Sequence, residues 1–169
     1  MHVAFVRSPH AHARIRAVDT SAARALEGVV DVVTAADLGD VWRPGPLLVP
    51  PPPVEGAVFH ERTVVPLVRD KARHVGEPIA AVVAASRALA EDAADLVRVD
   101  YEVLPAAVDL EASLDAGAPL VHDELGSNVA AHVVQRKGDW AEAARRADRV
   151  VARRLVYDRG AAAAVENRG

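Results

Sequence analysis

The fold is decided by the stretch RHVGEPIAAVVA at residues 73–84, together with the segments 86–96 and 97–104 that follow it. Residues 79–84 are a continuous run of small apolar side chains, which is too short for a typical helix and is bounded by Gly76 and Pro78. Such a run is typical of a strand that is covered on both faces. We therefore expect residues 79–84 to form the central strand of a sheet.

The two following segments have clear periodicities. Ser86 can accept a hydrogen bond from a free amide of the next turn, and the apolar side chains of 86–96 then fall on one stripe, with the acidic ones facing largely away. Residues 97–104 alternate between apolar and charged side chains until Pro105. The sequence therefore predicts an amphipathic helix on the sheet, followed by a strand with one wet face.

Breaks in the pattern predict the remaining elements. We expect strands at 2–7, 14–18, 29–34, 129–135 and 150–157, a short helix at 21–26 closed by a left-handed Gly28, a weak helix at 110–114, and a helix opened by Asp139 with Glu142 completing its capping box. Seven prolines between residues 39 and 67 preclude a regular strand ladder there. This Pro-rich excursion should lie on the surface, separate two β-α-β-like halves, and be ordered mainly by contact with another domain.

Composition excludes several classes of function. The 169 residues are 51% hydrophobic, which is enough for one domain with a core. A net charge of −4 with scattered arginines disfavours a nucleic-acid partner. The absence of cysteine excludes disulfides, thiolate nucleophiles, Fe–S clusters and cysteine-ligated zinc within these residues. No apolar run is long enough for a membrane span and no signal peptide is evident, so a cytoplasmic location is expected.

Few residues are candidates for chemistry. Neither a dinucleotide fingerprint nor a phosphate loop is present. The pair His10 and His12 could share a face and hold a metal, but a turn or surface pair is the favoured interpretation, because no third ligand can be located and arginines flank the pair. The cluster 122–124, His-Asp-Glu, could support acid–base chemistry, although a solvated loop is favoured.

Glu77 is the one carboxylate at a constrained turn that leads into the predicted central strand. Pro78 restricts Glu77 to extended geometry, so its side chain could accept backbone amides at the strand entrance. We favour this structural role over a catalytic one. Gly76, Glu77 and Pro78 together are therefore predicted to be a structural motif, and no catalytic, cofactor-binding or metal-binding residue is assigned.

Several motifs occur in an order and spacing that resemble one known family. They are SPHAHARI at 8–15, GVV at 28–30, VGEP at 75–78, VDYEVLP at 99–105, APLVH at 118–122, SNV at 127–129, GD at 138–139 and ENRG at 166–169. Together they resemble the opening domain of the molybdopterin-binding large subunit of the xanthine dehydrogenase, aldehyde oxidase and carbon monoxide dehydrogenase family. The chain departs from the family pattern at Ala164 and Val165, where Pro-Met is usual.

The resemblance implies an α+β fold of the α/β hammerhead type, with mixed sheet strands and packed short helices. It implies a hammerhead domain at 1–157 and, at 158–169, the start of a junction to molybdopterin-binding domains that are not in this chain. In the complete subunit, molybdopterin-bound molybdenum would oxidise an aldehyde, an N-heterocycle such as a purine, or carbon monoxide, with Fe–S and FAD on partner subunits or domains. This chain alone is expected to hold no cofactor, and the family's catalytic glutamate and cofactor-contacting glutamine belong to the missing portion.

A competing hypothesis is a stand-alone assembly or binding module left from such a subunit. Residues 161–169 lack a polar tail and are expected to continue into more protein, which favours the first interpretation.

Overall fold

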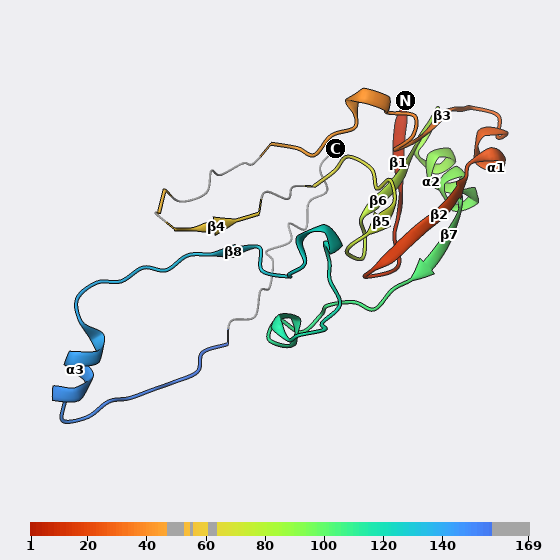
Figure 1. The fold of residues 1–169 in the computed structure, drawn as a ribbon. Coiled ribbons are helices and arrows are strands. Elements are labelled where there is room, and N and C mark those ends of the chain that lie inside the picture. Colours follow the sequence, from red (N-terminus) through yellow and green to blue (C-terminus); the bar gives the residue numbers. More distant parts are fainter. Residues whose placement is uncertain (47–52, 55, 61–63, 157–169) are drawn as a thin grey trace. The chain divides into compact units, whose positions relative to one another are not determined.

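The computed structural model describes residues 1–46, 53–54, 56–60 and 64–156. The chain divides into two units, 1–133 and 134–169, and each is described by itself. The first unit holds all the described strands and every described helix except the last (Figure 1). No helix among the described residues is both long and apolar enough to cross a membrane.

The decisive stretch forms the centre of a three-stranded sheet. Strand β6 (Pro78–Ala84) lies between β1 (His2–Arg7) and β3 (Val29–Thr34), and both pairings are antiparallel. The predicted central strand is therefore confirmed. The prediction that both of its faces are covered is only partly right, because Ala81 and Val83 are half-buried, whereas the fully buried residues are Ile79, Ala80, Val82 and Ala84.

One face of this sheet is covered by helix α2 (Arg87–Leu96). The predicted cap is confirmed, since Ser86 Oγ accepts a hydrogen bond from the amide of Leu89 at 3.2 Å. Small residues of α2, Ala90 and Ala93, are buried against the sheet, while its acidic side chains are exposed. The core beneath it consists of Ala23, Val32, Val82, Ala93 and Val97. Helix and sheet thus approach closely through small and β-branched side chains.

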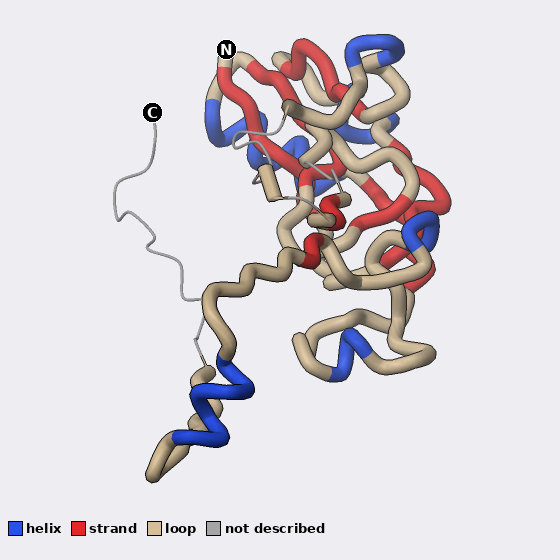
Figure 2. Tube along the Cα trace, turned by 60° about the vertical axis from the view of Figure 1, so that its left-hand side comes forward, coloured by secondary structure: helices blue, strands red, loops and turns tan. Residues whose placement is uncertain are grey.

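A second three-stranded sheet contains the strand that follows α2 in the chain. Strand β2 (Ala13–Asp19) lies between β5 (Lys71–Ala72) and β7 (Arg98–Val103), again with antiparallel pairings. Helix α2 therefore joins the centre of one sheet to an edge of the other. Figure 2 shows helices beside strands in the upper part of the view. The alternation predicted for β7 ends early, because Val103 is 62% exposed.

The shorter elements of the first unit differ in length from their predictions. Helix α1 (Ser21–Arg24) is shorter than predicted, although Gly28 has the expected left-handed conformation with φ 86°. The described residues of this unit include three 3₁₀ turns: η1 (Gly39–Val41), η2 (Ala112–Leu114) in place of the weak α-helix, and η3 (Asp123–Leu125). The predicted strand at 129–135 is only β8 (Ala131–His132), paired with β4 (Val58–Phe59) of the Pro-rich excursion.

The second unit contains helix α3 (Trp140–Arg146), which begins as predicted. Asp139 accepts a hydrogen bond from the amide of Glu142 at 2.9 Å. The strand predicted at 150–157 is wrong for 150–156, because these residues are exposed and pair with no described strand. Residue 157, the expected junction at 158–169 and parts of the Pro-rich excursion (47–52, 55 and 61–63) lie outside the described residues.

Candidate functional site

The motif Gly76-Glu77-Pro78 forms a turn that is tied to the end of β1 by backbone hydrogen bonds. The Gly76 amide donates to the Ser8 carbonyl at 2.8 Å, and the Ser8 amide donates to the Glu77 carbonyl at 2.9 Å. Arg7 adds a side-chain hydrogen bond to the Gly76 carbonyl at 2.9 Å. Gly76 has φ 84°, a left-handed conformation that other L-residues rarely adopt, so glycine is required by the backbone here.

The carboxylate of Glu77 points back into the protein. Its Oε2 atom accepts a hydrogen bond from the Arg73 amide at 2.6 Å, and the residue is 9% exposed. The carboxylate therefore holds together the turn 73–77, which precedes the central strand. This geometry corresponds to the structural role considered for Glu77, since its acceptor is used by the backbone.

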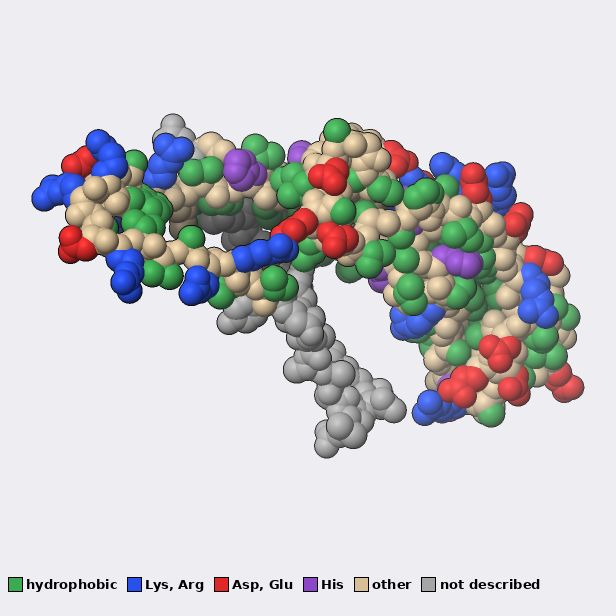
Figure 3. Space-filling model, turned by 90° about the horizontal axis from the view of Figure 1, so that it is seen from below, with side chains coloured by type: hydrophobic (Ala, Val, Ile, Leu, Met, Phe, Trp, Pro, Cys, Tyr) green, Lys and Arg blue, Asp and Glu red, His purple; other side chains and the backbone are tan. Residues whose placement is uncertain are grey.

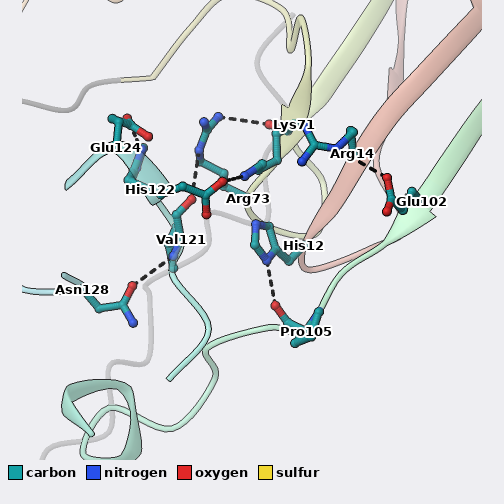
Figure 4. Close-up of polar contacts among 11 residues, drawn as sticks. His12, Arg14, Lys71, Arg73, Glu102, Pro105, Val121, His122, Glu124 and Asn128 are labelled. Carbon is teal, nitrogen blue, oxygen red and sulfur yellow. Dashed lines mark hydrogen bonds and ion pairs between the residues drawn. The ribbon is translucent and has the colours of Figure 1, made fainter. Parts of the chain in front are cut away.

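A polar network lies next to this turn and joins β5 to the segment 119–128 (Figure 4). Lys71 is 4% exposed, and its Nζ donates to the carboxylate of Asp123. The hydrogen bond from Lys71 holds the pKa of the Asp123 carboxyl below its ordinary value. The Arg73 guanidinium donates to the Val121 carbonyl at 3.2 Å and to the Lys71 carbonyl at 3.1 Å.

Asn128 organises the far side of the network. Its Oδ1 accepts from the Val121 amide at 3.0 Å, and its Nδ2 donates to the carbonyls of Ser113 and Pro119 at 3.0 and 2.9 Å. One amide side chain thus fixes three points of an irregular segment. Its position could be suspected from the SNV motif, but its partners could not be identified without the structure.

The two histidines of the first candidate pair have different neighbours. Both lie in the bend that joins β1 to β2, where the ring of His10 packs edge-on against Tyr101 at 4.8 Å. Of the two favoured interpretations, a turn or a surface pair, the turn holds, whereas the surface pair is wrong for His12, which is buried. The Nδ1 atom of His12 is 2.7 Å from the Pro105 carbonyl oxygen. Because a carbonyl only accepts, Nδ1 carries the proton, and the buried Nε2 lacks a hydrogen-bond partner among the described residues.

The His-Asp-Glu cluster at 122–124 was expected to be a solvated loop, but its side chains take part in specific polar contacts. Asp123 and Glu124 are exposed, yet Asp123 is bound by the buried Lys71, and the ring of His122 lies 3.3 Å from the Glu124 carboxylate. The role of Lys71 was missed at the sequence level because nothing in its neighbourhood distinguishes it from an exposed lysine.

A cavity of about 610 Å³ opens between these groups and the start of the Pro-rich excursion. Trp42 lines it, donates through Nε1 to the Leu67 carbonyl at 2.7 Å, and is covered by the Arg69 guanidinium 4.1 Å from its ring. Charges of both signs line the cavity, and Figure 3 shows charges of both signs side by side on the surface. In the described part of the chain, no three His, Asp or Glu residues are placed to hold a metal ion.

Comparisons with known proteins identify relatives that share this architecture. The family model for the aldehyde oxidase and xanthine dehydrogenase a/b hammerhead domain matches residues 1–105. The nicotine 6-hydroxylase large subunit of Paenarthrobacter nicotinovorans is 41% identical over 173 residues, covering 100% of this chain and 20% of that protein. The carbon monoxide dehydrogenase large chain of Afipia carboxidovorans is 43% identical over 121 residues, covering 72% of this chain and 14% of that protein.

Among solved structures, quinoline 2-oxidoreductase from Pseudomonas putida 86 is similar with a TM-score of 0.67 and 44% identity, covering 76% of this chain and 16% of that one. This chain therefore spans about a fifth of such proteins or less. The predicted α+β hammerhead fold is confirmed. Because the family model covers more than half of its residues, this chain belongs to the aldehyde oxidase and xanthine dehydrogenase family and contains its a/b hammerhead domain.

Proposed function

We propose that this chain is the N-terminal structural domain of a molybdenum hydroxylase large subunit and packs against the molybdopterin-binding domains of that subunit. The observation that carries the proposal is the match to the nicotine 6-hydroxylase large subunit, which covers this whole chain but only 20% of the relative. The hammerhead domain is proposed to span 1–157, including the Pro-rich excursion at 39–67, and 158–169 to begin the junction. A cytoplasmic location is part of the proposal and agrees with the cysteine-free sequence.

The role of the Gly76-Glu77-Pro78 motif in this domain is structural. The left-handed glycine, the carboxylate bound to the Arg73 amide and the bonds to Ser8 together fix where the central strand begins. The contact between Oε2 of Glu77 and the Arg73 amide is the one expected of a carboxylate that accepts backbone amides at the entrance of a strand. We therefore assign Glu77 to the architecture of the domain.

The cofactor belongs outside this chain. The nicotine 6-hydroxylase large subunit is matched over only 20% of its length, so most of such a subunit is available to hold the cofactor. When bound in the complete subunit, molybdopterin-bound molybdenum would supply the oxidation of an aldehyde, an N-heterocycle or carbon monoxide, and Fe–S and FAD groups on partners would carry the electrons away. No residue of this chain is assigned to those groups.

The test has two parts: the activity of the chain by itself, and its binding to a large subunit from which the corresponding region has been removed. The 169-residue chain is purified, and its molybdenum content and dye reduction with nicotine, an aldehyde and carbon monoxide are measured; neither metal nor turnover is expected. It is then co-expressed with the nicotine 6-hydroxylase large subunit from which the matched region has been removed, and copurification is expected. Stoichiometric molybdenum with turnover in the chain alone would contradict the proposal, whereas failure to copurify would favour a stand-alone module.

A further inference from the structure

The sheet β1-β6-β3 has one face that the described helices leave uncovered. The strand register places its side chains in two rows: Phe5, Ala81 and Val33 lie side by side in one row, and Val3, Val83 and Asp31 lie in the next. We call the five apolar residues of these rows, Val3, Phe5, Val33, Ala81 and Val83, the open face. The alternate residues of the same strands point to the opposite face, where α2 packs.

Exposure differs sharply between the two faces. On the α2 side, Ala80, Val82 and Ala84 are fully buried. On the open face, Phe5 is 48% exposed and Val3 is 55% exposed. Only the end of the open face near Pro78 is closed, because the Val68 amide donates to the Pro78 carbonyl at 2.8 Å and Val68 is buried there. The remainder is apolar sheet surface without a described covering element.

The open face carries almost no charge. Asp31 is the only charged residue in the two rows, and the Arg24 guanidinium binds its carboxylate at 2.6 Å. β1 is also an edge strand, since it pairs only with β6 among the described strands. The guanidinium of Arg7, at the end of β1, lies 5.3 Å from the centre of the Phe5 ring. An edge strand with large exposed apolar side chains is nevertheless a surface that native proteins usually cover.

We propose that the open face is the surface on which this domain docks onto the remainder of its own large subunit. The inference rests on the proposed function, and it identifies the contacting surface. The nicotine 6-hydroxylase large subunit is matched over only 20% of its length, so most of such a polypeptide is available as the partner.

The size of the face argues against a second copy of this chain as the occupant. Three strands spaced ~4.8 Å apart and two rows ~7 Å apart give a patch of only about 10 Å by 7 Å between Cα positions. A stable complex between separate chains normally buries about 800 Å² on each partner. The open face would therefore be the apolar centre of a larger intramolecular contact.

The test uses the co-expression of the tagged 169-residue chain with the nicotine 6-hydroxylase large subunit that lacks the matched region. The variant Phe5→Asp places a charge in the open face. Val103→Asp is the control, because Val103 is also an exposed apolar residue, 62% against 48% for Phe5, and lies on an edge strand of the other sheet. Wild type and Val103→Asp should recover equal amounts of the partner. Phe5→Asp should lower recovery by about tenfold or more, since it replaces the large aromatic side chain of the contact by a small charged one.

Two further measurements make the outcomes distinct. Circular dichroism tests whether the Phe5→Asp variant is folded. If the variant is unfolded, carbene footprinting of the wild-type chain takes its place, and Val3 and Phe5 should be labelled less in the complex than in the chain alone. A folded Phe5→Asp that recovers the partner normally, or unchanged footprinting, would overturn the inference and leave the proposed function standing. Failure of wild type to recover the partner would overturn both. A dimer of the chain alone that Phe5→Asp dissociates would identify a second copy as the occupant instead.

Discussion

Replacing Glu77 by glutamine should lower the stability of the domain. The carboxylate of Glu77 is 9% exposed and accepts the Arg73 amide at 2.6 Å, and a charge-assisted hydrogen bond of this kind is worth about 1.5–3 kcal/mol. Glutamine keeps an oxygen at the same place but contributes only a neutral hydrogen bond, worth about 0.5–1.5 kcal/mol. The free energy of unfolding should therefore fall by about 1 kcal/mol in Glu77→Gln. In Glu77→Ala it should fall by about 2–3 kcal/mol, because the Arg73 amide loses its partner.

The measurement is denaturant unfolding of the 169-residue chain, with the slope of the transition checked for constancy. Glu27→Gln is the control, because Glu27 is exposed and its substitution should change stability by less than about 0.5 kcal/mol. The same Glu77→Gln substitution is then assayed for turnover in a complete large subunit that contains this domain. Unchanged stability together with abolished turnover would refute the structural role of Glu77 and place it in the active site.

Three other predictions follow from the polar network and the excursion. Because the hydrogen bond from Lys71 holds the pKa of Asp123 below its ordinary value, the pair stabilises the fold fully above pH ~4 and loses this contribution as the pH falls through the lowered pKa. Asp123→Asn should therefore reduce the loss of unfolding free energy on acidification in the wild-type chain, but not in a chain that carries Lys71→Met. An equal reduction in both chains would contradict the pairing of Lys71 with Asp123. Asn128→Ala removes three hydrogen bonds and should cost about 2–3 kcal/mol, seen as faster hydrogen exchange at 113–128, and unchanged exchange would show that these bonds are dispensable. Limited proteolysis of the chain should cut within 39–67 before the central strand, and the reverse order would contradict the domain interpretation.

The elements predicted best are those whose signals are local. The continuous apolar run gave the central strand, and Ser86 and Asp139 both cap helices because a hydroxyl or carboxylate reaches an amide three residues on. Gly28 adopts the left-handed conformation that its place after a helix suggested. Each of these features is determined by residues within one or two turns of the chain.

The failures share a dependence on distant partners. The segment 150–156 is rich in β-branched and apolar residues and so resembles a strand. A strand needs a neighbour to pair with, however, and no described strand provides one. The predicted strand at 129–135 is cut to two residues because β4 is no longer than that. Lys71 and Asp123 are 52 positions apart, and neither carries a local signal for the other. The VGEP motif was therefore enough to locate the candidate site in the sequence. The polar network of Lys71, Arg73, Asp123 and Asn128 could not be predicted from the sequence.

The pairing of β1 with β6 has a consequence for how this domain can change over evolution. These strands join residues near position 5 to residues near position 81, and everything between them, including 39–67, forms a loop that must close when the sheet forms. The entropy of closing a loop grows only with the logarithm of its length, so doubling it costs about 0.6 kcal/mol. Insertions and deletions at 39–67 should thus change the free energy of forming the sheet very little. This segment is where members of the family can lengthen or shorten their sequence to suit a different neighbour, while the strands that bracket it stay the same.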